Sequence, residues 1–322
     1  MSKPHILVTG SSGYLASNLI EELSKNNNYN LTALDIEPSS KLPKSVNFQK
    51  VNISNADQLN IALDGVDLIC HCASLGGTKY GVDICTEDEI RNTNIEGTQN
   101  IYQQAKKKGI NKIVLTSSIA VLSLKLKKEK WPIKESHVSE PDDFYGASKS
   151  EQEKIAKNFA NNDGMQTLAL RTCAFFPLNN TEKGFRLTGT HAMIEDVVKA
   201  HILAIEVLLD NKRSSGIKGF EAIFITNKLP YQEDDKTLID SDGKMKKLIK
   251  KYWPDHADYL FSLGYKKALL PAVYDLSKAK KILNWEPTFN FDQWLSSSDM
   301  PSKKKNFWIL KLKKIFKILQ KN

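Results

Sequence analysis

The chain has 322 residues, 26% of them charged and 41% hydrophobic, which is long enough for one large α/β domain or for a nucleotide-binding domain with a smaller lobe. Its net charge of +9 is concentrated at the C-terminus, because residues 303–322 contain eight lysines and no acid, which leaves 38 basic against 37 acidic residues elsewhere. A nearly neutral body argues against nucleic-acid binding, so no nucleic acid is expected as a partner.

The four cysteines show neither a CxxC motif nor a spacing with histidine that would suit a metal, so no metal site is expected. Cys70 and Cys72 flank His71 in an apolar run, where strand alternation places both sulfurs on one face as packing groups. Unpaired cysteines favour a reducing compartment. With no signal peptide and no run of eighteen apolar residues, the sequence predicts a cytoplasmic protein.

The N-terminus carries a glycine-rich turn between a strand and a helix. An apolar run at residues 5–8 predicts a buried strand, and apolar residues at helical spacing follow from Leu15. Gly10 suits a tight turn, Gly13 suits close approach of backbone to a pyrophosphate, and Ala16 lets the helix pack against the strand. A dinucleotide is therefore expected at Gly10, Gly13, Tyr14 and Leu15, on the N–H groups of the helix N-terminus.

The second strand, residues 31–34, ends in Asp35, whose carboxylate suits the two adenosine ribose hydroxyls and would repel a 2′-phosphate. This favours NAD over NADP; the alternative is an ordinary βαβ turn without a ligand. The next strand, residues 46–51, ends in Asn52 and Ile53, where the amide either bonds the adenine edge or only forms a turn.

Further strands and helices alternate along the chain. Strands are predicted at residues 66–73, 113–118, 165–172 and 220–225, and helices at residues 56–63, 87–108, 142–161, 195–208 and 275–283. This order predicts an α/β fold, a doubly wound parallel Rossmann sheet with a smaller C-terminal substrate lobe. We expect an NAD-binding domain at residues 1–170, mainly the lobe at 171–295 and a basic tail at 296–322. Because ligands bind at the carboxyl ends of such strands, Gly10, Asp35, Ala73 and Ser118 should share one edge.

Three side chains suit hydride transfer at an alcohol carbon. Tyr145 and Lys149 are four residues apart on one helical face, and Ser118 ends a strand. An ammonium near the phenol would lower the pKa of Tyr145 toward neutrality, so that Tyr145 can act as the base while Ser118 orients the substrate oxygen. Lys149 would also bond the nicotinamide ribose. The alternative is a surface pair on a helix, without catalytic meaning.

These motifs together resemble the extended short-chain dehydrogenases/reductases of the NAD-dependent epimerase/dehydratase family. The resemblance covers most of residues 4–290 and rests on the N-terminal turn, Asp35, Cys72–Ala73, residues 94–98, residues 116–118, Tyr145 with Lys149, Arg171, residues 194–201 and residues 275–287. It implies that Tyr145 is the acid/base, that Lys149 modulates it, and that Ser118 orients the substrate. Asn52, Ile53, Ala73 and Asn94 are then expected at the cofactor, and a homodimer is usual in similar proteins.

The sequence departs from the family pattern at two places. Ile119 and Ala120 follow Ser118 where 4,6-dehydratases carry an Asp-Glu pair, so dehydration is not expected. Only twenty residues separate Arg171 from His191, a segment that is longer in sugar-nucleotide epimerases and that here looks more like that of uronate dehydrogenases. Arg186, and with less support Arg171, could hold a carboxylate or phosphate bidentately. Ser74, Tyr80 and Arg186 are the predicted substrate contacts, whereas His71, His191 and His201 are expected to be structural.

The sequence thus predicts NAD-dependent hydride transfer at a secondary alcohol of a sugar or nucleotide sugar, by an epimerase or a dehydrogenase. The alternatives are a carbonyl reductase resembling dihydroflavonol reductases, which use NADP, and a non-catalytic NAD-binding scaffold at a membrane. In residues 303–322 a helical projection places Trp308, Leu312 and Phe316 opposite several lysines. Such a segment either lies on an anionic membrane surface as a peripheral contact, packs on the body, or binds a partner.

Overall fold

The computed structural model describes residues 3–76, 78–79, 82–83, 85–239, 245–265 and 271–297. Seven parallel strands form one sheet in the order β3-β2-β1-β4-β7-β8-β9. Their bounds are β1 His5–Thr9, β2 Asn30–Asp35, β3 Asn47–Lys50, β4 Leu68–His71, β7 Lys112–Ser118, β8 Gln166–Thr172 and β9 Phe220–Ile225. The order reverses between β1 and β4, which is where doubly wound sheets bind their ligands.

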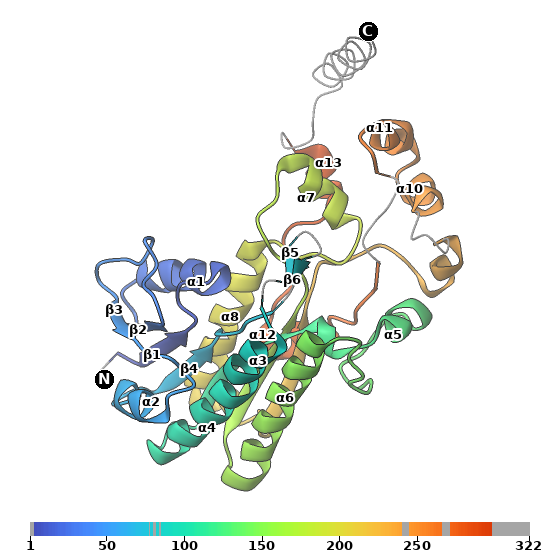
Figure 1. Cartoon of the computed structure of the whole chain (residues 1–322). Coiled ribbons are helices and arrows are strands. Elements are labelled where there is room, and N and C mark those ends of the chain that lie inside the picture. The colour runs from blue at the N-terminus through green and yellow to red at the C-terminus, as the bar shows by residue number, and fades with distance from the viewer. Residues whose placement is uncertain are drawn as a thin grey trace.

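Helices cover both faces of the sheet (Figure 1). On one face lie α1 (Tyr14–Ser24), α8 (Ile194–Leu209) and α12 (Ser277–Leu283). On the other face lie α2 (Ala56–Ala62), α4 (Gly97–Lys107) and α6 (Phe144–Asp163). Each layer encloses a separate apolar core against the sheet, so the prediction of a doubly wound parallel fold is confirmed.

Local sequence explains the central elements. All four residues of β4 are buried, as expected for a strand with helices on both sides. In α6, the side chain of Asp143 accepts a hydrogen bond from the Gly146 N–H at the N-terminus, and Gly164 ends the helix with a φ of 68°. These two caps fix where α6 begins, and therefore where Tyr145 in its first turn lies.

The predicted helix at residues 87–108 is helical throughout in the structure, with a change of helix type in its middle. It is divided into α3 (Glu87–Ile90), a π-helical segment η1 (Arg91–Glu96) and α4. The side chain of Asn94 in η1 is buried, and its amide bonds groups outside the helix. Gly97 packs against Ile53, where an added Cβ would lie 2.5 Å from the Ile53 Cδ1. The strand predicted at residues 66–73 is shorter in the structure, because only Leu68–His71 (β4) pair with the neighbouring strands.

The C-terminal lobe has a third core and includes α7 (Asn180–Leu187), α10 (Lys246–Tyr252), α11 (Ala257–Ser262) and α13 (Phe291–Ser296). Smaller elements are the β5–β6 pair (Thr78–Lys79, Val82–Asp83), α5 (Leu124–Glu129), α9 (Asn211–Ser214), and the short η2 (Ile119–Val121), η3 (Glu233–Leu238) and η4 (Pro254–His256). Gly184 of α7 lies against Trp294, where an added Cβ would come within 2.3 Å of the indole. The predicted tail at residues 303–322 lies outside the described residues, among which no helix has the length and apolarity needed to cross a membrane.

Candidate active site

The glycine turn after β1 lies directly against the end of β4. Gly10 has a φ of 67°, and a Cβ at this position would lie 2.6 Å from the Ala73 Cα, so any other residue would be both strained and in contact with backbone. Gly13 precedes α1 without a side-chain cap. The first N–H groups of α1 therefore remain available to a phosphate at the positive end of the helix dipole.

The Asp35 carboxylate lies beside this turn, where one oxygen accepts the Ser12 N–H at 2.9 Å and the other accepts the Ile36 N–H at 2.7 Å. Asn52 is exposed and its Oδ1 accepts the Ser54 N–H, while Ile53 is buried. The glycine turn can accept the pyrophosphate of a dinucleotide. The Asp35 carboxylate at the end of the neighbouring strand suits free ribose hydroxyls, which NAD has.

The structure brings Ser118 and Tyr145 together at the same edge of the sheet. Ser118 ends β7, and its hydroxyl lies near enough to the phenol of Tyr145 to lower the pKa of that phenol. The contact depends on Gly146, because α6 passes so close to η2 that a Cβ there would lie 2.3 Å from the Ala120 carbonyl oxygen. The YxxxK spacing alone does not show that position 146 must be glycine for α6 to pass this close to η2.

Lys149 is buried one helical turn further along α6, at 2% exposure. Its Nζ donates to the Thr116 carbonyl oxygen at 2.9 Å and lies 5.8 Å from the centroid of the Tyr145 ring. The three predicted catalytic side chains therefore converge. The ammonium, however, is held by the backbone of β7 and faces the ring of Tyr145.

The pKa of Tyr145 differs from the sequence expectation. Burial raises this pKa to about 12, and the hydrogen bond from Ser118 offsets only part of the rise. Burial also lowers the pKa of Lys149 to about 8. The expectation of an acidified phenol is wrong for this structure, because desolvation of the phenol outweighs the effect of Ser118, and the charge of Asp143 adds to the rise in pKa.

A short loop after β4 covers the Tyr145 ring. Gly76 in this loop has a φ of 135°, and a Cβ there would lie 2.2 Å from the Tyr145 Cδ2. Asn94 fixes the loop, because its amide accepts the Leu75 N–H at 2.8 Å and donates to the Leu75 carbonyl at 2.7 Å. Asn94 also bonds Ser148 and the predicted substrate residue Ser74. The structure thus gives Asn94, predicted at the cofactor, a set of contacts that positions the loop, while Tyr80 lies outside the described residues.

Arg171, left by the sequence as a possible ligand contact, has its guanidinium engaged inside the protein. Its Nε and Nη2 donate to the two carboxylate oxygens of Glu153 at 2.9 and 2.8 Å, and both side chains are 3% exposed. Ser117, beside Ser118, donates to the same carboxylate at 2.7 Å. Because Glu153 lies one turn beyond Lys149 on α6, this network joins the helix to β7 and β8. Positions 145, 149 and 153 share one helical face, a spacing that could have identified Glu153.

Replacing Arg171 with Met is expected to cost about 3–5 kcal/mol of unfolding free energy, because the Glu153 carboxylate would remain buried without its partner. Urea denaturation measures this loss. As a control, Lys154→Met removes the exposed ion pair with Glu151 on the same helix and should cost less than about 1 kcal/mol. Equal losses in the two variants would contradict the burial argument.

The expected structural role of two histidines is confirmed. His71 bonds Thr9 and Thr98, and His201 bonds Thr116 and the Val197 carbonyl. Burial lowers their pKa values, to about 3 for His71 and about 4 for His201, so both rings are neutral. His191 differs, because its buried Nδ1 has no hydrogen-bond partner among the described residues.

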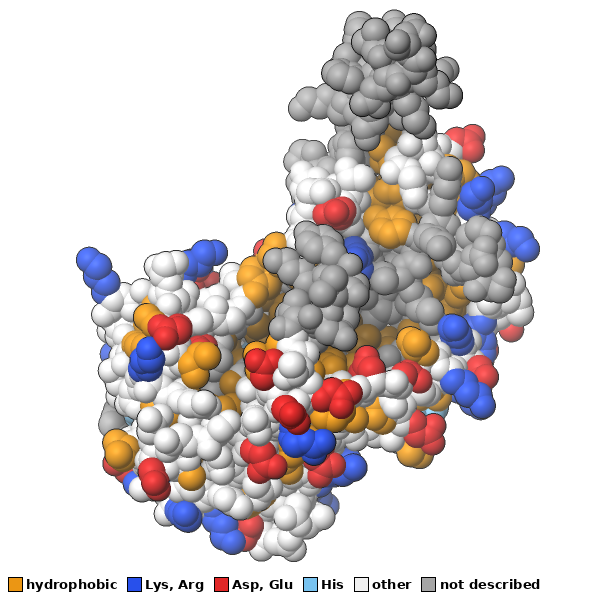
Figure 2. All heavy atoms as spheres, viewed as in Figure 1, with side chains coloured by type: hydrophobic (Ala, Val, Ile, Leu, Met, Phe, Trp, Pro, Cys, Tyr) orange, Lys and Arg blue, Asp and Glu red, His pale blue; other side chains and the backbone are white. Residues whose placement is uncertain are grey.

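Arg186 lies on α7, with its guanidinium 5.1 Å from the centroid of the Phe176 ring. It forms no ion pair within the described part of the chain, and partial burial lowers its pKa. A small cavity of about 190 Å³ lies nearby, between the start of α1 and the segment before α8, and is lined mainly by aromatic and apolar side chains. Tyr14, Leu75 and Phe176 are 38%, 36% and 46% exposed around this edge of the sheet. Figure 2 shows hydrophobic side chains in the hollow between the sheet and the lobe.

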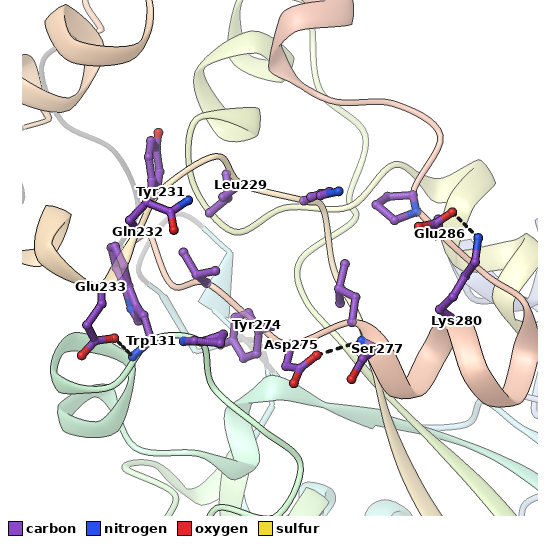
Figure 3. A pocket seen from close by; sticks show the side chains of 15 residues that line it. Trp131, Leu229, Tyr231, Gln232, Glu233, Tyr274, Asp275, Ser277, Lys280 and Glu286 are labelled. Carbon is purple, nitrogen blue, oxygen red and sulfur yellow. Dashed lines mark hydrogen bonds and ion pairs between the residues drawn. The ribbon is translucent and has the colours of Figure 1, made fainter.

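A separate hollow of about 540 Å³ lies beyond the end of β9 (Figure 3), and none of the predicted site residues lines it. Its polar groups pair with one another: Glu233 accepts the Trp131 N–H, Asp275 accepts the Ser277 N–H, and Lys280 pairs with Glu286 (Figure 3). The predicted catalytic residues therefore lie where β4 and β7 end, and not in this hollow.

Two curated relatives match nearly the full chain. Sterol-4-alpha-carboxylate 3-dehydrogenase (decarboxylating) of Saccharomyces cerevisiae is 25% identical over 91% of this chain and 96% of its own length. A 3 beta-hydroxysteroid dehydrogenase/Delta 5→4-isomerase of Mycobacterium tuberculosis is 24% identical over 90% of this chain and 88% of its own length. An Escherichia coli 4-epimerase acting on N-acetyl-alpha-D-glucosaminyl-diphospho-ditrans,octacis-undecaprenol matches a shorter part, 27% identical over 49% of this chain and 44% of its own length.

Solved structures share the fold. A UDP-glucuronic acid 4-epimerase from Bacillus cereus in complex with NAD has a TM-score of 0.64 and 20% identity, over 92% of this chain and 97% of its own. A uronate dehydrogenase from Agrobacterium tumefaciens, also complexed with NAD, has a TM-score of 0.64 and 19% identity, over 94% and 92%. The prediction of NAD agrees with these complexes. The family model of the 3-beta hydroxysteroid dehydrogenase/isomerase family matches residues 7–188, so the chain belongs to this family of extended short-chain dehydrogenases/reductases.

Proposed function

We propose that the protein catalyses NAD-dependent hydride transfer at a secondary alcohol on a ring. The observation that carries this proposal is the convergence of Ser118, Tyr145 and Lys149 at the edge of the sheet that also holds the Gly10 turn and Asp35. When bound, NAD supplies the acceptor for the hydride. The residues Gly10, Gly13, Tyr14, Leu15 and Asp35 would hold it.

The protein's own residues then handle the proton. The Tyr145 Oη takes the proton of the substrate hydroxyl during oxidation and returns it during reduction. Ser118, which lies beside this phenol, orients the substrate oxygen. Lys149, held by the Thr116 carbonyl, supplies positive charge beside the ring and favours the phenolate once the hydroxyl is engaged.

This assignment predicts a rise in the oxidation rate with pH. Because the pKa of Tyr145 is about 12, the phenol is protonated at neutral pH, and the fraction of phenolate grows tenfold for each pH unit below that pKa. The kcat/KM for NAD reduction should therefore rise from pH 6 to pH 8, and that for ketone reduction should not. A flat profile for NAD reduction, with chemistry shown to be rate-limiting, would contradict Tyr145 as the base.

For the substrate we propose a sterol-like hydroxyl compound. Leu75 and Phe176 expose apolar surface around the site, which suits an apolar ring system better than a nucleotide. The short segment between β8 and α8 supports this choice, because it leaves few residues to hold a diphosphate. The two near-full-length relatives named above act, by their names, on sterols and steroids.

A second candidate is a sugar acid or nucleotide sugar, the substrate class predicted from the sequence. Arg186 favours it, since a half-buried guanidinium without an ion pair among the described residues suits a carboxylate or phosphate. The fold neighbours include, by their names, a uronate dehydrogenase and a UDP-sugar epimerase. For these substrates a dehydrogenase releases NADH, whereas an epimerase re-reduces its ketone and shows no net NADH.

A substrate panel distinguishes these candidates. Absorbance of reduced nicotinamide is followed with 3β-hydroxysterols, with and without a 4α-carboxylate, and with free uronates and UDP-sugars. Turnover of sterols only supports the first candidate, and turnover of uronates or epimerisation of UDP-sugars supports the second. A carbonyl reductase would instead prefer NADPH with ketones, and a scaffold would bind NAD without any turnover.

We further propose that residues 303–322 contact an anionic membrane surface, on the strength of their lysines and apolar residues alone. Deleting these residues should abolish co-sedimentation with liposomes that contain anionic lipid while leaving NAD binding intact. Unchanged liposome binding by the truncated protein would contradict this contact. The homodimer implied by the resemblance stays a prediction, and sedimentation equilibrium tests it.

A further inference from the structure

Two thiols lie in contact under the edge of the sheet where the cofactor is expected. The Cys70 Sγ and the Cys72 Sγ are 3.7 Å apart. Cys70 is fully buried within β4, whereas Cys72 follows the last residue of this strand and is only partly buried. Cys72 directly follows His71, which still pairs with both β1 and β7, so moving the Cys72 backbone toward Cys70 would disturb this end of the sheet.

The surroundings of the two sulfurs differ. The Thr116 hydroxyl oxygen and the Cys72 Sγ are 3.3 Å apart, and the positive charge of Lys149 lowers the pKa of the Cys72 thiol. The hydrogen bond from Cys70 contributes most to lowering the pKa of the Cys72 thiol. The pKa of Cys70, in contrast, is raised well above its ordinary value by its bond to Cys72 and by burial. Thiolate character and access both favour Cys72 as the nucleophile.

We propose that Cys72 is an oxidation site for peroxides and that Cys70 is its resolving thiol. The Cys72 thiolate attacks one peroxide oxygen, the O–O bond breaks, and a sulfenic acid and hydroxide form. The Cys70 sulfur then attacks the Cys72 sulfur, an S–S bond forms, and the S–O bond breaks. The proton of Cys70 and the departing hydroxide combine as water. The two thiols lose two electrons, and the peroxide is reduced.

The disulfide would act on the cofactor site through Ala73. Closing the sulfur–sulfur distance from 3.7 Å to about 2.05 Å must pull residue 72 toward β4. Ala73 follows directly, its N–H bonds the Thr9 hydroxyl at 3.1 Å, and its Cα forms the surface against which Gly10 turns. Oxidation therefore distorts the glycine turn and weakens NAD binding, while bound NAD, by holding that turn, slows oxidation.

The experiment uses the full chain carrying Cys85→Ser, which removes the other partly exposed thiol. Hydrogen peroxide is added with and without saturating NAD, remaining thiols are blocked with N-ethylmaleimide, and peptides are analysed by mass spectrometry. We expect a Cys70–Cys72 disulfide that forms more slowly with NAD. Titration calorimetry should then show NAD affinity at least tenfold lower after oxidation and restored by dithiothreitol.

Variants separate the two thiols. Adding Cys70→Ser should leave a sulfenic acid on Cys72 that dimedone traps, and adding Cys72→Ser should abolish both products; Cys70→Ala replaces Cys70→Ser if the serine does not fold. Cys173→Ser, a substitution of a buried thiol elsewhere, should change nothing. Oxidation at Cys173 as fast as at Cys72, or a Cys70–Cys72 disulfide that leaves NAD affinity unchanged, would overturn the proposal.

Discussion

Replacing Tyr145 with Phe is expected to lower kcat by about 10² to 10⁴-fold, the usual contribution of a general acid/base. The substitution removes the Oη that lies near Ser118 but keeps the ring that packs against Gly76. NAD affinity should therefore change little, because the turn at Gly10 and the Asp35 carboxylate remain. Steady-state kinetics with the best substrate of the panel, together with NAD titration, measures both quantities.

Tyr29→Phe is the matched control. It also removes one phenolic oxygen, but Tyr29 lies just before β2, at the opposite end of that strand from Asp35. Its kcat should equal that of the unmodified protein. If Tyr145→Phe retains more than about a tenth of the activity while Ser118→Ala abolishes it, the proton passes through another group, and the role of Tyr145 is wrong.

Replacing Gly10 with Ala is expected to abolish NAD binding and to destabilise the fold. A left-handed φ of 67° costs a residue with a Cβ about 1–2 kcal/mol. The new Cβ would also lie 2.6 Å from the Ala73 Cα, and such overpacking adds about 1–3 kcal/mol. Because the nearest atoms to this Cβ belong to the backbone of Ala73, the clash is relieved only by moving the turn that should hold the pyrophosphate. Urea denaturation and NAD titration measure the two effects.

Gly109→Ala is the control that separates backbone strain from the steric contact with Ala73. Gly109 has a φ of 73°, close to that of Gly10, but no heavy atom lies within 4 Å of its added Cβ. This control should cost only about 1–2 kcal/mol and leave NAD binding unchanged. Equal stability losses and intact NAD binding in both variants would show that the approach of Gly10 to Ala73 has no role at the cofactor site.

The sequence was sufficient for the parallel sheet and for the edge at which the site lies. Apolar periodicity and the glycine turn identified β1, α1 and β2 closely, because these signals are local. The helix predicted at residues 87–108 is present, but its π-helical segment was not predictable, because Asn94 uses its side chain to hold Leu75, a contact between segments that periodicity does not contain.

In the candidate site, too, some features could be predicted from local sequence patterns and others depend on contacts between distant segments. The convergence of Tyr145, Lys149 and Ser118 was predictable from spacing and strand order. The direction of the Tyr145 pKa was not, because it depends on how deeply the loop at Gly76 buries the ring and on which atom Lys149 bonds. The sequence left Arg171 as a possible ligand contact. Its partner Glu153 lies on another element, so the ion pair between them is not visible in the sequence.

A crystal structure of the protein with NAD tests the central claim most directly, by the position of the nicotinamide relative to Tyr145. The account predicts the pyrophosphate on the first turn of α1, the adenosine ribose on Asp35, and the nicotinamide C4 facing a space bordered by Ser118 and the Tyr145 hydroxyl, with Lys149 at its ribose. A nicotinamide that lies away from Ser118 and Tyr145, or a cofactor that does not contact the Gly10 turn, would contradict it.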